Sequence, residues 1–236
     1  MVFDTETDTG FTAHPPRGER GIYMLTVHHL GRSQSERVVW LCEELGLEYE
    51  LKRYDRDPIT FLAPPAYKAL HLMGTAPVIT DDKLVLAESG AIVQYLVSRY
   101  GEGRLQVAPD HADFANYLFW MHFANGSLQA VLHRYLVVRR LKLAPDHPTL
   151  LATEDRVERA LKTVDARLAA GSYLVGSDFT AADIMTVFCL TTMRTFVSVD
   201  LAPYPNVLAY LGRIGEREGY RRAMRKSDPE MTPLLT

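Results

Sequence analysis

The sequence predicts an α/β domain with a mixed sheet, followed by an all-helical domain. Before residue 103, short apolar stretches with the two-residue alternation of strands are interspersed with helical patterns. After Gly103 the strand patterns stop, and apolar residues recur only at helical spacing. We therefore expect a flexible extension at residues 1–21, the α/β domain at 22–102, the helical domain at 103–227 and a tail at 228–236.

The first domain contains alternating strand and helix patterns. The expected segments are a strand at 23–28, a helix to Leu45, a strand at 48–54, a loop with a short helix at 57–67, strands at 76–80 and 84–87, and a helix at 89–99. Gly46 and Gly101 end the two longer helices, and Asp81-Asp82 is the expected hairpin turn. A strand–helix–strand opening implies a parallel pair, and the closing hairpin adds antiparallel strands. The order βαβαββα is that of a thioredoxin-like domain.

The second domain is predicted to be helical throughout. The expected segments are a long aromatic-rich helix at 110–140, a helix through 157–168, a helix after the capping-box pattern Thr180–Asp183, and a final helix at 207–214. Asp183 is expected to be structural.

Composition excludes several classes of function. Net charge is −3 with acidic and basic residues interspersed, so nothing indicates a nucleic-acid partner. No apolar run approaches membrane-span length, and the start lacks a signal-peptide layout. The two cysteines, Cys42 and Cys189, lie far apart in apolar surroundings, which favours a reducing cytoplasm. His28 and His29 are neighbours on a strand and face opposite sides, so no metal site is expected.

Three motifs stand in order along the first domain: residues 33–46 (SQSERVVWLCEELG), 74–79 (GTAPVI) and 86–92 (LAESGAI). The second half adds YLVG at 173–176, TAADI at 180–184 and YPN at 204–206. Together they resemble the glutathione S-transferase family, in particular its serine-type bacterial and fungal members. The resemblance implies glutathione as co-substrate and a homodimer in which the first domain of one subunit faces the helices of the other.

Ser33 lies in the turn between the first strand and the first helix. A free thiol is mostly protonated at neutral pH, and a hydroxyl hydrogen bond or a helix N-terminus favours the thiolate. The resemblance implies that Ser33 donates to the glutathione thiolate. A serine before a helix also commonly caps it, and Ser35 is the alternative donor or the cap itself.

The other two motifs are expected to hold glutathione. The resemblance implies a cis peptide between Ala76 and Pro77, which directs the main chain of Val78 at the cysteinyl backbone. Ser89 opens a helix, where free N–H groups attract the γ-glutamyl carboxylate, and Glu88 pairs with the γ-glutamyl ammonium.

Thr75 departs from the family pattern. Many relatives carry lysine there, which can pair with a glutathione carboxylate, and threonine cannot supply that charge. The charge can come instead from Lys52, Arg53, Lys68 or His71, among which the sequence does not choose.

The acceptor substrate is expected between the domains. The expected helical wall is Tyr117, Trp120, Met121, Phe123 and Asn125, although aromatic residues at helical spacing are also common in cores.

We expect a detoxifying transferase in which glutathione thiolate attacks a small hydrophobic electrophile, or a peroxide. One alternative is a non-catalytic glutathione-binding or regulatory protein. A second is a specialised glutathione-dependent lyase, such as an etherase or a dehalogenase.

Overall fold

The computed structural model describes residues 25–236, and the predicted extension at 1–21 lies outside them. The first domain is built on four strands, β1 (Thr26–Leu30), β2 (Glu50–Tyr54), β3 (Val78–Asp81) and β4 (Leu84–Ala87), in the order β2-β1-β3-β4. β1 and β2 are parallel, and the other two pairs are antiparallel. The predicted mixed sheet and thioredoxin-like domain are confirmed.

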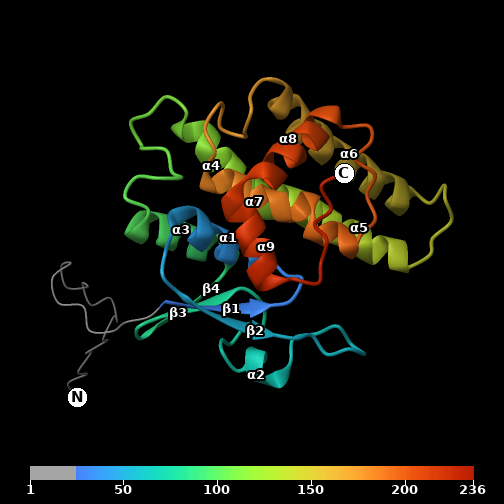
Figure 1. The fold of residues 1–236 in the computed structure, drawn as a ribbon. Coiled ribbons are helices and arrows are strands. Elements are labelled where there is room, and N and C mark those ends of the chain that lie inside the picture. Colours follow the sequence, from blue (N-terminus) through green and yellow to red (C-terminus); the bar gives the residue numbers. More distant parts are fainter. Residues whose placement is uncertain (1–24) are drawn as a thin grey trace, which may run out of the picture.

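Helices cover both faces of this sheet. α1 (Glu36–Leu45) and α3 (Ser89–Tyr100) lie between the sheet and the second domain, while the short α2 (Pro65–Lys68) lies on the other face (Figure 1). α1 ends at Gly46, whose φ of 64° is the left-handed conformation that glycine adopts without strain. Because α1 is covered from both sides, even Glu36 and Arg37 on it are buried.

The second domain is helical, as predicted. Its elements are α4 (Phe114–Phe123), a π-helical turn (Ala124–Gln129), α5 (Ala130–Arg140), α6 (Pro148–Ala169), α7 (Ala181–Leu190), a 3-10 turn (Thr192–Thr195), α8 (Pro205–Glu216) and α9 (Glu218–Ser227). The capping box of α7 is present, with Thr180 N donating to Asp183 at 2.8 Å. No helix in the described part of the chain has the length and apolarity to cross a bilayer.

Several boundaries differ from the predictions. The first strand runs on to Leu30, and the hairpin turn is Asp82-Lys83, with Asp82 at a φ of 54°. The predicted helix at 110–140 is divided by the π-helical turn around Asn125. These shifts move the element ends and leave the order of elements unchanged.

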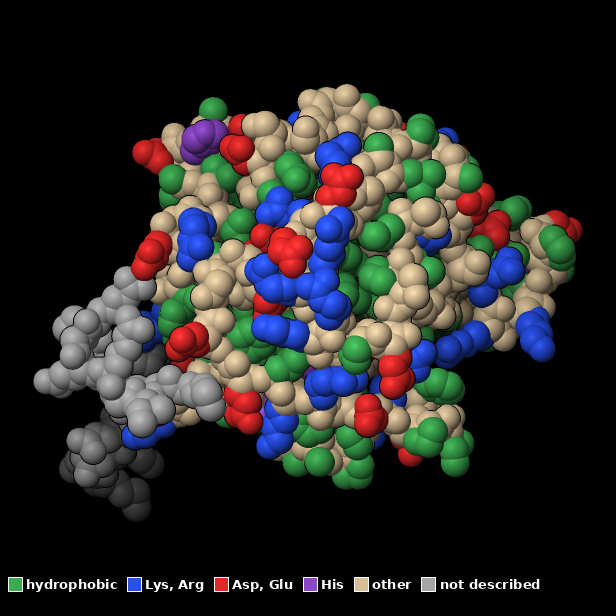
Figure 2. All heavy atoms as spheres, viewed as in Figure 1, with side chains coloured by type: hydrophobic (Ala, Val, Ile, Leu, Met, Phe, Trp, Pro, Cys, Tyr) green, Lys and Arg blue, Asp and Glu red, His purple; other side chains and the backbone are tan. Residues whose placement is uncertain are grey.

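Helix α9 was not predicted at all. Its buried residues, Tyr220, Ala223, Met224 and Ser227, follow helical spacing within a highly charged segment, which hides the apolar pattern. α9 packs on α1. Figure 2 shows Lys and Arg side chains gathered over α9, near the centre of the face in view. Arg222 and Lys226 pair with Glu43 of α1. α9 thereby fixes the chain that follows it beside the first turn of α1.

Candidate functional site

The turn between β1 and α1 holds Ser33 and Ser35 with their hydroxyl oxygens 2.6 Å apart. Ser33 is 6% exposed and its Oγ also accepts from the backbone N–H of Ser35 at 3.2 Å. Ser35 stands at the N-cap position of α1 but makes no side-chain capping bond. Its Oγ instead accepts from the N–H of Leu30 at 3.1 Å. The expectation that Ser35 caps the helix is wrong, because its hydroxyl is turned back toward β1.

His29 and Asp228 complete this cluster from opposite ends of the chain. Nδ1 of His29 lies 2.9 Å from Ser35 Oγ, and its Nε2 lies 3.1 Å from Asp228 Oδ2. The other carboxylate oxygen of Asp228 accepts from the N–H of Arg32 at 3.0 Å. Burial raises the pKa of Asp228, but the hydrogen bond and charge of His29 and the N–H of Arg32 outweigh it and hold this pKa below its ordinary value.

The two neighbouring histidines face opposite sides of the strand, as expected. His28 contacts Tyr54 and Thr80, whereas His29 contacts Ser35 and Asp228. In residues 25–236 no group of three or more His, Cys, Asp or Glu side chains is placed to hold a metal ion.

Ser89 lies at the first turn of α3 and is 2% exposed. Its Oγ accepts from Arg37 Nη1 at 3.0 Å and from Asn125 Nδ2 at 2.9 Å, and donates to Gln34 at 3.1 Å. Arg37 also donates to Asn125, Gln34 and Gln129, and none of its hydrogen-bond partners among the described residues is a carboxylate. Burial lowers the pKa of Arg37, but arginine remains charged at neutral pH. A buried positive charge, held by neutral hydrogen-bond partners, therefore stands behind the N-terminus of α3.

Glu88 precedes Ser89 and is exposed, with a φ of 71°. Few residues other than glycine adopt this conformation, which occurs often at ligand sites. The peptide bond between Ala76 and Pro77 is cis, as the resemblance implies, and Val78 follows it into β3 between β1 and β4.

A cleft of about 490 Å³ lies between α3 and α4. Of the five predicted acceptor residues, Tyr117, Met121 and Asn125 line it, together with Glu88. Ser33 is not among the described residues that line this cleft.

Trp120, which is buried, and the partly exposed Phe123 are not among the residues that line this cleft. Their rings pack on each other, with centroids 5.1 Å apart, and both contact Phe119. The structure thus divides the predicted wall into three cleft residues and two members of an aromatic cluster.

The replacement of a lysine charge at position 75 by Lys52, Arg53, Lys68 or His71 stays a prediction. Thr75 is exposed, as are Lys52, Arg53 and Lys68. Arg37 was not among the predicted site residues, although its position gives a readable signal: it stands four residues before Leu41, on the apolar face of α1. A charged residue on such a face has to find polar partners inside the protein.

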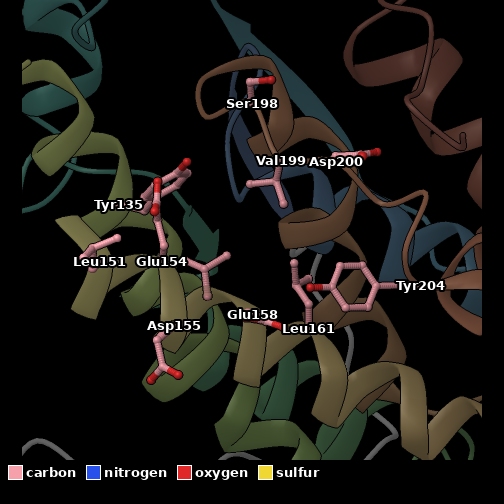
Figure 3. Close-up of a pocket in the computed structure, with 11 residues that line it drawn as sticks. Tyr135, Leu151, Glu154, Asp155, Glu158, Leu161, Ser198, Val199, Asp200 and Tyr204 are labelled. Carbon is pink, nitrogen blue, oxygen red and sulfur yellow. The ribbon is translucent and has the colours of Figure 1, made fainter. Parts of the chain in front are cut away.

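A second hollow, of about 440 Å³, lies between α5, α6 and the segment that precedes α8 (Figure 3). The carboxylates of Glu154, Asp155, Glu158 and Asp200 line it. Asp155 and Glu158 are paired within α6 to Arg159 and Lys162, and Figure 3 shows that Asp155 and Asp200 do not converge. We assign no ligand to this hollow.

Both cysteines are buried. Burial raises the pKa of Cys42, and it raises the pKa of Cys189 to about 11 despite the nearby charge of Arg37. Neither thiol is a thiolate at neutral pH, so neither is a ready nucleophile.

Two family models match this chain. The N-terminal domain of glutathione S-transferase matches residues 32–99, and the C-terminal domain matches residues 113–218. The first match contains the β1–α1 turn, the cis-proline and the start of α3, and the second begins at α4.

Related proteins are similar in sequence to this chain over most of its length. Glutathione S-transferase 3 of Schizosaccharomyces pombe is 32% identical, covering 90% of this chain and 92% of the relative. Glutathione S-transferase 1 of Saccharomyces cerevisiae is 30% identical, covering 86% and 95%. The crystal structure of a glutathione S-transferase from Actinobacillus pleuropneumoniae, 37% identical, superposes with a TM-score of 0.79 over 87% of this chain and 93% of that chain. The chain belongs to the glutathione S-transferase family.

Proposed function

We propose that this protein is a serine-type glutathione transferase in which Ser33 stabilises the glutathione thiolate for attack on a small apolar electrophile. The observation that carries the proposal is the position of Ser33. Its hydroxyl lies just before the N-terminus of α1, held by two contacts to Ser35. A thiolate at this point gains both a hydroxyl donor and the positive end of the helix.

Glutathione would lie across the three motifs of the first domain. Ser33 receives the sulfur, Val78 after the cis Ala76–Pro77 bond pairs with the cysteinyl backbone, and the Glu88–Ser89 corner holds the γ-glutamyl group. Arg37, 3.0 Å from Ser89 Oγ, supplies positive charge toward the γ-glutamyl carboxylate, which compensates for threonine at position 75.

Tyr117, Met121 and Asn125 form the polar and apolar wall of the proposed acceptor site, beside Glu88. Trp120 and Phe123 support this wall from the neighbouring aromatic cluster. We further propose a homodimer in a reducing cytoplasm, with the exposed Leu118 and Phe119 of α4 in contact with the partner. Light scattering of the purified protein measures its mass in solution, and a monomer at micromolar concentration would contradict the dimer.

The serine assignment is tested by Ser33→Ala with a halo-nitroaromatic acceptor. Loss of a donor to the developing thiolate should lower turnover by about tenfold or more, while the urea unfolding curve remains cooperative. Ser177→Ala, at an exposed serine whose hydroxyl bonds to the neighbouring Asp178, is the matched control and should behave as wild type. Unchanged turnover in Ser33→Ala would move the role to Ser35 or to backbone donors.

The rival function is non-catalytic glutathione binding, which threonine at position 75 favours. Titration calorimetry with glutathione separates the cases. Absence of binding at millimolar glutathione would overturn the transferase proposal, and binding without turnover of halides, ethers or peroxides would establish the rival. Turnover of ethers or alkyl halides alone would identify a specialised lyase.

A further inference from the structure

A continuous hydrogen-bonded chain links the segment after α9 to the first turn of α1. It runs Asp228–His29–Ser35–Ser33, with separations of 3.1, 2.9 and 2.6 Å. All four side chains are at least nine-tenths buried. Two of the four members, His29 and Asp228, have no role in the function proposed above.

With a neutral His29, one arrangement of protons satisfies every contact in this chain. The carboxylate of Asp228 only accepts, so Nε2 of His29 carries a proton and donates to it. In the neutral imidazole Nδ1 is then an acceptor. It lies 2.9 Å from Ser35 Oγ, nearer than the carbonyl oxygen of Leu30 at 3.3 Å, so the hydroxyl of Ser35 donates to Nδ1. Ser35 Oγ accepts in turn from the N–H of Leu30 and from the hydroxyl of Ser33. Every donor in the chain therefore points toward Asp228.

This arrangement makes the Ser33 oxygen an acceptor toward the glutathione site. Its own proton is directed at Ser35, and the N–H of Ser35 occupies one lone pair. The second lone pair remains to accept the S–H of an incoming thiol.

We propose, on the basis of the function proposed above, that Ser33, Ser35, His29 and Asp228 form a proton relay that deprotonates glutathione. The thiol S–H bond breaks and its proton moves to Ser33 Oγ. The former Ser33 proton moves to Ser35 Oγ, and the former Ser35 proton forms an N–H bond at Nδ1 of His29. Each serine again has one proton, the imidazole has become imidazolium, and the sulfur keeps the electron pair.

The transfer reverses the hydrogen bonds between Nδ1 of His29 and the thiol, while Nε2 of His29 still donates to Asp228. His29 now donates to Ser35, Ser35 donates to Ser33, and Ser33 donates to the thiolate, which is the contact expected of the active serine. When the thioether leaves, the proton returns along the same path to solvent.

Asp228 is the positioning residue of this relay. An ordinary imidazole is a weaker base than a thiolate, so the adjacent carboxylate has to stabilise the imidazolium. It also selects the tautomer that leaves Nδ1 free. The charged groups near the pair among the described residues include Arg53 on β2, opposite His29, Arg32 in the turn before α1 and Arg56 after β2. Glu36 on α1 also lies near Asp228, but burial raises the pKa of its carboxyl to about 8.

The test is the pH dependence of the bound thiolate, followed by its ultraviolet absorbance. Asp228→Asn keeps an oxygen that accepts from the N–H of Arg32 but presents an NH₂ group to Nε2 of His29. Nε2 must then accept, so the proton of His29 moves to Nδ1. Nδ1 can no longer accept a proton from Ser35, and the relay is blocked. We expect the apparent pKa of the bound thiol to rise by about one unit or more. Ser35→Ala interrupts the relay and should raise it similarly. Glu230→Gln, two residues along the same segment, should leave it at the wild-type value.

The outcomes separate this proposal from the one on which it rests. If the Asp228→Asn variant folds and binds glutathione, and the bound thiol keeps its wild-type pKa, the relay is overturned and the role of Ser33 is unaffected. Absence of glutathione binding to the wild type, or unchanged turnover in Ser33→Ala, would remove both. If Asp228→Asn loses its cooperative urea transition, Ser35→Ala decides, because it removes one buried oxygen and leaves Asp228 bonded to His29.

Discussion

Asn125 of the helical domain donates a hydrogen bond of 2.9 Å to the hydroxyl of Ser89 in the first domain. Its side-chain oxygen also accepts from Arg37 at 2.8 Å. One amide in the π-helical turn thus satisfies a buried cation and holds the start of α3. The arrangement of the proposed glutathione site therefore depends on how the two domains pack.

Asn125→Ala should destabilise the fold by about 1–3 kcal/mol, because it leaves buried polar groups of Arg37 and Ser89 with one partner fewer. Urea unfolding measures this loss. Asn116→Ala is the matched control, since the side chain of Asn116 is exposed on α4 and bonds to the nearby Asp113. Equal stability of the two variants would show that the amide contributes nothing across the domains.

Arg37→Met should weaken glutathione binding by about tenfold, the equivalent of one lost charge-assisted interaction. Arg37→Lys retains the charge and should weaken it less. Titration calorimetry compares the two dissociation constants. Equal weakening would mean that Arg37 acts through packing and not through its charge.

Arg217 donates two hydrogen bonds to Glu44 of α1, at 2.9 and 2.8 Å, and its guanidinium lies 3.6 Å from the ring centre of Phe179. Arg217→Lys loses the bidentate geometry and the stacking, so thermal and urea unfolding should show a loss of about 1–2 kcal/mol. Arg159→Lys, in an exposed pair with Asp155, should leave stability unchanged. Similar losses in the two variants would contradict a specific role for Arg217.

Asp228 should make the free energy of unfolding depend on pH in the acid range. Its pKa is lower in the folded protein than its ordinary value of 3.8, so its contribution is complete above that value and is lost as pH falls through the folded-state pKa. Asp228→Asn should therefore be less stable than wild type at pH 7, and the difference should shrink progressively below pH 3.8. Urea unfolding at neutral and acid pH checks the sign, and a difference that grows toward acid would contradict it.

The order of elements was predictable because most of them carry local patterns. The capping box at Thr180 and Asp183, the glycine after α1 and the strand alternation are read within a few residues of sequence. The motif around Glu88 and Ser89 was equally local. These features depend on the backbone near them and not on distant partners.

The hydrogen-bond partners at the site were not predictable in the same way. His29 and Asp228 are 199 residues apart, and no periodicity joins them. Arg37 finds its amide partners only because the π-helical turn brings Asn125 and Gln129 to it. Helix α9, which places Asp228, was obscured because its few apolar residues stand among charges.

The place of Asp228 in the chain also sets an order of events during synthesis. A ribosome makes the whole first domain, with Ser33, Ser35 and His29, well before it reaches Asp228. Until then the imidazole has no carboxylate to fix its tautomer, even if the sheet and α1 have already formed. The turn between β1 and α1 therefore reaches its final hydrogen-bonding state only after α9 has been synthesised and has docked on α1.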